Sequence, residues 1–195
     1  IFGMVTTAVV TNLKSGEHRN ELRLSAQGFA SQIREMQTMS QTGRTIKLCT
    51  GQGSIGSLEY CADSHAGELC GLRATLCDCS CAEQVSPGGY GLHIAGGIVT
   101  TFADADSSHL YEPGEEFNRA NFDLPDRIAV QALTPSSPLD IVFTPPNGSV
   151  WINGCDPEVL GDTCPNLAQI TLNHLRLSQT RTVTIYRVTG RIEAE

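Results

Sequence analysis

One apolar stripe near the start of the chain constrains the fold more than any other feature of the sequence. Its members recur at alternating steps of four and three residues, the spacing of one face of an α-helix. They are Leu22, Ala26, Phe29, Ile33, Met36 and Ser40. No proline occurs before Gly43, and this glycine stands where a helix would end. The sequence therefore predicts a long N-terminal helix over residues 1–43.

Beyond Gly43 the pattern changes to short alternating runs separated by turn residues, which is typical of antiparallel strands. Gly96-Gly97 and the run Pro145-Pro146-Asn147-Gly148 are hairpin signals between such runs. The predicted strands are Thr45–Thr50, Tyr90–Ala95, Ile98–Ala103, Leu139–Phe143, Ser149–Ile152, the alternating run from Ile170 to Leu175, Thr182–Val188 and Arg191–Ala194. We expect an α+β protein: a long N-terminal α-helix followed by an antiparallel β-sheet head over residues 44–195.

The net charge changes sign close to the same position, near residue 47. Residues 1–47 carry six basic and three acidic side chains, a net +3, so the other 148 residues carry −11 of the total −8. An acidic head argues against a general nucleic-acid binder, because phosphate affinity comes mainly from Lys and Arg. Ile1–Val10 contains no charge. We interpret it as the remnant of a longer hydrophobic anchor, because it runs without a cap into the long helix; a core helix turn or a buried strand is the alternative. No apolar run in this sequence reaches the roughly 18 residues of a membrane span.

Eight cysteines, an even number, indicate an oxidising compartment and therefore an exported protein stapled by disulfides. Cys155 and Cys164 are the predicted pair, because they close a polar loop far along the chain from the other six. The pairing of those six stays open: Cys49, Cys61, Cys70, Cys77, Cys79 and Cys81. Most of them lie in a cysteine-rich insertion at residues 50–89. A thiolate metal site at residues 77–81 is the alternative, but it lacks the second cysteine pair of a zinc site.

An acidic segment after the first hairpin carries oxygen ligands at the spacing of a calcium loop. Counted from the first aspartate, they fall at positions 1, 3, 5, 7, 9 and 12, with a backbone carbonyl at position 7. The candidate ligands are Asp104, Asp106, Ser108, Leu110, Glu112 and Glu115. His109 stands where such a loop has glycine, and no amphipathic helix precedes the segment. Calcium is therefore a candidate ligand, and a solvated acidic hairpin tip is the alternative.

Catalytic motifs are weak, and we predict that the chain is not an enzyme. Residues 51–56 match G-x-G-x-x-G, but no helix follows to hold a pyrophosphate, so we interpret them as a loop. There is no G-x-S-x-G elbow and no H-E-x-x-H pair. His93 and His174 lie in strand patterns, and we interpret them as ordinary surface or half-buried residues. A secreted calcium- or zinc-dependent enzyme is the remote alternative.

Several segments together resemble bacterial type IV pilin-like proteins, specifically the GspH/FimT group of minor pilins and pseudopilins. In this order they cover about three quarters of the chain. The segments are Ala26–Thr42, Gly43–Cys49, Tyr90–Leu92, Thr100–Asp104 with Glu112–Glu115, Ile141–Pro145 with Gly148, and Arg181–Ile192. Members of the group begin with a hydrophobic stretch that is not in this sequence, and residues 50–89 match nothing in the group.

This resemblance implies a structural subunit of a type IV pilus or a type II secretion pseudopilus. Such a subunit is anchored in the inner membrane, and then polymerises with copies of itself or with other pilins in a periplasmic or extracellular filament. It implies no required cofactor and no small-molecule substrate. The residues expected to serve assembly lie on the helical stripe: Leu22, Ala26, Phe29, Ile33 and Met36.

Some members of the group bind DNA through a basic G-R-x-R ending, which suggests an alternative role as a pilus-tip module for DNA uptake or adhesion. The candidate contacts here are Arg187 and Arg191. At the end of the corresponding motif, Glu193 replaces the last arginine, which weakens this role.

Overall fold

The structure is a computed structural model that describes residues 2–50, 58–60, 80–113, 115–116, 124–158 and 164–195. Side chains are described in these ranges apart from residues 2–15, 46–50, 58–60 and 80–84. The glycine loop at 51–56 falls outside the described residues. So do the side chains of the six cysteines whose pairing the sequence leaves open.

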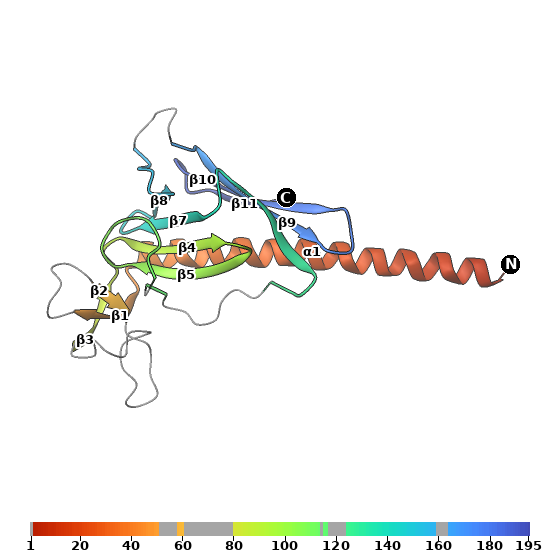
Figure 1. Ribbon diagram of the computed structural model, residues 1–195, viewed down its shortest axis with the longest axis horizontal. Coiled ribbons are helices and arrows are strands. Elements are labelled where there is room, and N and C mark those ends of the chain that lie inside the picture. The colour runs from red at the N-terminus through yellow and green to blue at the C-terminus, as the bar shows by residue number, and fades with distance from the viewer. Residues whose placement is uncertain (1, 51–57, 61–79, 114, 117–123, 159–163) are drawn as a thin grey trace.

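The N-terminal helix α1 spans Phe2–Thr42 and ends where the sequence predicts. Gly43 has a φ of 61°, a left-handed conformation that glycine adopts without strain. Its N–H donates to the carbonyl of Ser40 (3.3 Å), and the N–H of Arg44 donates to the carbonyl of Met39 (3.0 Å). These bonds satisfy carbonyls at the end of the helix. The N-terminal part of α1 projects well beyond the strands (Figure 1).

Two four-stranded antiparallel sheets form most of the head, where the sequence led us to expect one. The first has the order β5-β4-β7-β8, with bounds β4 Gly89–Ala95, β5 Ile98–Asp104, β7 Leu139–Thr144 and β8 Ser149–Ile152. The second has the order β11-β10-β9-β6, with bounds β6 Ile128–Thr134, β9 Leu167–His174, β10 Thr180–Tyr186 and β11 Ile192–Ala194. The α+β layout is as predicted.

A third, three-stranded sheet has the order β2-β1-β3 and follows the end of α1. Its strands are β1 Thr45–Thr50, β2 Leu58–Tyr60 and β3 Ser80–Val85. The backbone register sets Cys49 directly opposite Cys81. Parts of the predicted cysteine-rich insertion are therefore strands that pair with β1.

Most hairpins fall where turn residues predict them. Ala95 pairs with Ile98 across Gly96-Gly97, whose φ angles of 57° and 83° suit a tight two-residue turn. The β7–β8 hairpin turns at residues 145–148. Strand β6 is not among the predicted strands, because a bulge between Val130 and Ala132 interrupts the period of two that reveals a strand.

The apolar stripe of α1 packs against the head of its own chain. Helix α1 contacts β4 and β7 of the first sheet and β9, β10 and β11 of the second. All five stripe residues predicted to serve assembly are buried in this core: Leu22, Ala26, Phe29, Ile33 and Met36. Their assignment to contacts between subunits is therefore wrong, because their surface is already covered within the chain.

A row of polar side chains on α1 fixes the helix to turns of the head. The guanidinium of Arg34 donates to the carbonyl of Ile192 at 2.9 Å, and the amide of Gln37 donates to the carbonyl of Gly190 at 3.1 Å. One turn further on, the amide of Gln41 lies 3.5 Å from the carbonyl of Asn147. Residues at this spacing share one helix face. The row therefore orients the helix as well as attaching it.

Among the described residues, no helix combines the length and the apolar character that crossing a membrane requires.

Substitution of two leucines on α1 tests whether the apolar stripe packs against the head. Leu22 is 1% exposed, and Leu24 on the opposite face is 54% exposed. Leu22→Ala should cost about 2–5 kcal/mol, because it leaves a cavity between helix and sheet, whereas Leu24→Ala should cost about 0.5 kcal/mol or less. Urea denaturation of the isolated protein measures both. Equal costs would contradict the packing described.

Candidate functional site

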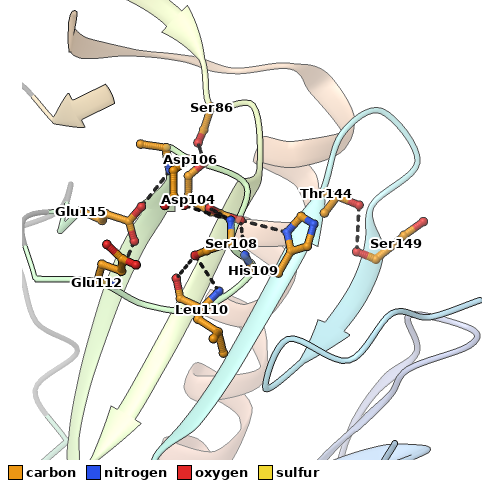
Figure 2. Close-up of polar contacts among 11 residues, drawn as sticks. Ser86, Asp104, Asp106, Ser108, His109, Leu110, Glu112, Glu115, Thr144 and Ser149 are labelled. Atoms are coloured by element: carbon orange, nitrogen blue, oxygen red, sulfur yellow. Dashed lines mark hydrogen bonds and ion pairs between the residues drawn. The ribbon is translucent and has the colours of Figure 1, made fainter. Parts of the chain in front are cut away.

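The acidic segment forms a loop that starts at the end of β5 and returns to it. Asp104 is the last residue of β5 and is fully buried. The backbone pairs Phe102 with Glu116, and the N–H of Ala103 donates to the carbonyl of Glu115 at 3.0 Å. The carboxylates of Asp104 and Glu115 therefore face the interior of the same loop (Figure 2).

His109 and the loop backbone are the partners of the Asp104 carboxylate. The N–H groups of Ser108 and His109 donate to it at 3.1 and 3.0 Å, and Nδ1 of His109 lies 2.9 Å from its Oδ2. His109 has a φ of 57°, so it adopts the left-handed conformation that a calcium loop usually gives to glycine. The imidazole thus occupies one side of the carboxylate that a cation would otherwise contact.

Glu115 is held by two backbone donors. Its Oε1 accepts the N–H of Ala105 at 2.9 Å, and its Oε2 accepts the N–H of Glu112 at 3.0 Å. Burial outweighs these bonds and raises the pKa of Glu115 to about 7. Burial also raises the pKa of Asp104, against the lowering effect of His109.

Three of the six predicted calcium ligands converge. One carboxylate oxygen each from Asp104, Asp106 and Glu115 lies within 4.8 Å of the others. Ser108 and Leu110 bond to each other instead, with the hydroxyl 3.1 Å from the carbonyl. Calcium takes six to eight oxygens, so this loop would need several waters to complete a shell. Calcium binding here stays a prediction.

Close packing behind the loop allows only glycine at position 88. A Cβ on Gly88 would lie 2.1 Å from the Asp104 carboxylate, and the N–H of Gly88 donates to the Asp104 carbonyl at 3.0 Å. The hydroxyl of Ser86 donates to the same carbonyl at 2.5 Å. Both the backbone and the carboxylate of Asp104 are therefore fixed by the segment before β4.

Contacts between aromatic rings attach the loop to the first sheet. Tyr111 stacks on His93 with ring centroids 4.2 Å apart, and His109 packs on Trp151 at 3.8 Å. His93 in turn contacts the buried Asp140, with Nδ1 2.6 Å from Oδ1. This pair was not predicted, since it depends on the β4–β7 register that sets the two residues opposite each other. The loop is thus fixed at its middle as well as at its ends.

The cysteine pair that the sequence singles out is confirmed. Cys155 and Cys164 form a disulfide, with their Cα atoms 5.6 Å apart. Asp156, the residue after Cys155, accepts a hydrogen bond from Arg187 through its carbonyl.

Arg187 is a structural residue, so its proposed contact with DNA is wrong for this structure. It is 1% exposed, and its guanidinium donates to the carbonyl of Asp156 and to the side chain of Asn166. Arg191 is exposed, lies over the Tyr186 ring and pairs with Glu193 at 3.3 Å. The two arginines therefore do not form one exposed basic surface.

Comparisons with protein families, with curated proteins and with solved structures find no match to this chain.

The raised pKa of Glu115 predicts a pH-dependent stability. A carboxyl whose pKa is higher in the folded than in the unfolded state stabilises the fold at pH values below its ordinary value of about 4.5. That contribution is lost as the pH rises through about 7, and it amounts to roughly 3 kcal/mol. With a calcium chelator present, the free energy of unfolding should therefore fall between pH 5 and pH 7.5.

Glu115→Gln should flatten this part of the pH profile, while also losing one acceptor for a backbone N–H. The exposed Glu112→Gln is the matched control and should keep the slope. Urea denaturation at several pH values measures both. An unchanged slope in Glu115→Gln would contradict the assignment.

Arg187 and Arg191 provide a second matched pair. Arg187→Ala should cost about 3 kcal/mol, because it leaves buried acceptors without donors and opens a cavity. Arg191→Ala should change the stability by about 0.5 kcal/mol or less. Thermal denaturation followed by circular dichroism distinguishes them. A small effect of Arg187→Ala would show that the guanidinium is not a structural group.

Proposed function

We propose that this chain is a structural subunit of a type IV pilus or of a type II secretion pseudopilus, and that it assembles through the N-terminal part of α1. The observation that carries the proposal is the projection of α1 beyond the strands of the head (Figure 1). Residues 2–17 of this helix would extend for about 24 Å. The first thirteen residues of the chain carry no charge.

Two parts of α1 have different roles in this proposal: one packs against the head and the other contacts neighbouring subunits. The stripe from Leu22 to Met36 is buried against the head, so we assign the contacts between subunits to the part of α1 that lies further toward the N-terminus. An uncharged helical segment such as residues 2–13 gains stability by packing against apolar surface, whether lipid or the same segment of neighbouring subunits. Contacts between different surfaces of successive copies produce an open helical filament.

The proposal also implies where the subunit is located in the cell and that it catalyses no reaction. The subunit is exported, held at the inner membrane before assembly, and then incorporated in a periplasmic or extracellular filament. The Cys155–Cys164 disulfide fits an oxidising compartment. The function proposed is mechanical, with no catalytic step and no required cofactor.

The alternative of a DNA-binding tip module loses support. It relied on Arg187 and Arg191, and Arg187 is buried. No described feature favours DNA over assembly.

A valine pair tests assembly directly. Val9→Asp places a charge on the projecting helix, and should reduce incorporation into sheared filaments at least 10-fold, because burying an unpaired carboxylate is costly. Val188→Asp makes the same change at a position of the head that is 64% exposed, and should incorporate normally. Immunoblotting of the sheared fraction measures both.

The stability of the head should be unchanged in Val9→Asp, which separates assembly from folding. Normal incorporation of the Val9→Asp subunit into filaments would contradict the proposal.

A further inference from the structure

A cluster of two histidines and a glutamate lies where α1 contacts the end of β9. His18 and Glu21 come from one face of α1, three residues apart, and His174 is the last residue of β9. One nitrogen or oxygen atom from each side chain lies within 4.8 Å of the other two. The cluster joins elements 153 residues apart in sequence, so no spacing in the chain reveals it.

The distances within the cluster suit a tetrahedral metal ion. Oε2 of Glu21 lies 3.4 Å from Nε2 of His174 and 3.7 Å from Nδ1 of His18. Ligands at 2.0–2.1 Å from a tetrahedral zinc ion are about 3.4 Å apart. The two distances to Glu21 are therefore close to those of a coordination tetrahedron, and the third pair of ligand atoms, from His18 and His174, lies within 4.8 Å. Side-chain movements would bring all three atoms to one face of the tetrahedron.

Burial leaves the cluster open on one side. The side chain of His174 is 0% exposed, whereas those of His18 and Glu21 are 16% and 31% exposed. An ion can therefore enter from the helix side and keep a water molecule as its fourth ligand. The rigid strand fixes one ligand and the helix fixes the other two.

We propose that His18, Glu21 and His174 form a binding site for a zinc-like divalent transition-metal ion. Two imidazoles and one carboxylate suit zinc, cobalt or nickel, whereas calcium and magnesium prefer oxygen ligands alone. The ion clips α1 to the second sheet. This inference is independent of the proposed filament function.

The hydrogen bonds of His174 specify what changes when the ion binds. In the metal-free protein, the N–H of Arg176 donates to Nδ1 of His174 at 3.1 Å, so the ring hydrogen lies on Nε2 and points to Glu21. Metal ligation at Nε2 moves that hydrogen to Nδ1 and displaces the N–H of Arg176. Because Arg176 lies in an exposed turn, its N–H then bonds to water.

Zinc and cobalt titrations of the full chain test the site. The protein is oxidised, shown to contain no free thiol, and stripped with EDTA before the titration. We expect one ion per chain, the visible absorption of four-coordinate cobalt, and a rise in Tm of about 5–10 °C at a zinc concentration 100 times the Kd.

Nitrogen-15 NMR of the histidine rings gives the decisive readout. We expect His174 to change from the Nε2–H tautomer to the Nδ1–H tautomer at one equivalent of zinc. Retention of the Nε2–H tautomer overturns the proposal.

Surface variants on α1 avoid disturbing the buried histidine. Glu21→Gln and His18→Ala should each weaken zinc binding by more than the roughly 10- to 100-fold that losing an outer-shell partner costs. Glu35→Gln makes the same change at an exposed position of the same helix, and should bind zinc like the wild type. Equal affinity of Glu21→Gln and the wild type overturns the site, as does the absence of stoichiometric binding.

Discussion

Burial of one face of α1 is the constraint on which the rest of the head depends. The chain enters the first sheet for β4 and β5, leaves it for β6 of the second, and returns for β7 and β8 before it completes the second. The buried sides of both sheets meet the same helix: Tyr90, Leu92 and Ile94 come from the first, and Ile170, Val183 and Ile185 come from the second. The helix thus supplies a hydrophobic core that both sheets share.

Local sequence signals were sufficient to predict helix ends, tight turns and the alternation of single strands, because these features depend on residues close together in the chain. The stop at Gly43, the turn at Gly96-Gly97 and the alternation of Ile170, Leu172 and His174 all predict what the structure contains. The division into two sheets could not be predicted, because it depends on which strands pair over long distances. The full burial of His174, interpreted from the sequence as a half-buried or surface residue, is a consequence of that pairing, since it places the ring against α1.

The spacing of oxygen ligands in the acidic loop does not reveal which hydrogen-bond donors the fold supplies to them. The sequence pattern identifies the oxygens that a cation would bind, but it cannot identify the hydrogen-bond donors that the fold brings to the same oxygens. Here backbone N–H groups and His109 bond to Asp104, and two further N–H groups bond to Glu115. These donors offset part of the cost of burying the two carboxylates, although burial still raises the pKa of both.

The polar row on α1 has a consequence for how this protein can vary. Arg34, Gln37 and Gln41 donate to main-chain carbonyls of the head, and every amino acid carries a carbonyl. The side chains at Asn147 and Ile192 are therefore not what these three bonds recognise. Gly148 and Gly190 are different, because each combines a left-handed φ (67° and 64°) with an amide nitrogen close to where a Cβ would lie. That nitrogen belongs to Gln41 for Gly148, at 2.9 Å, and to Gln37 for Gly190, at 2.7 Å. The side chains of these turns can thus vary while the helix stays attached to the head, provided that these two glycines are kept.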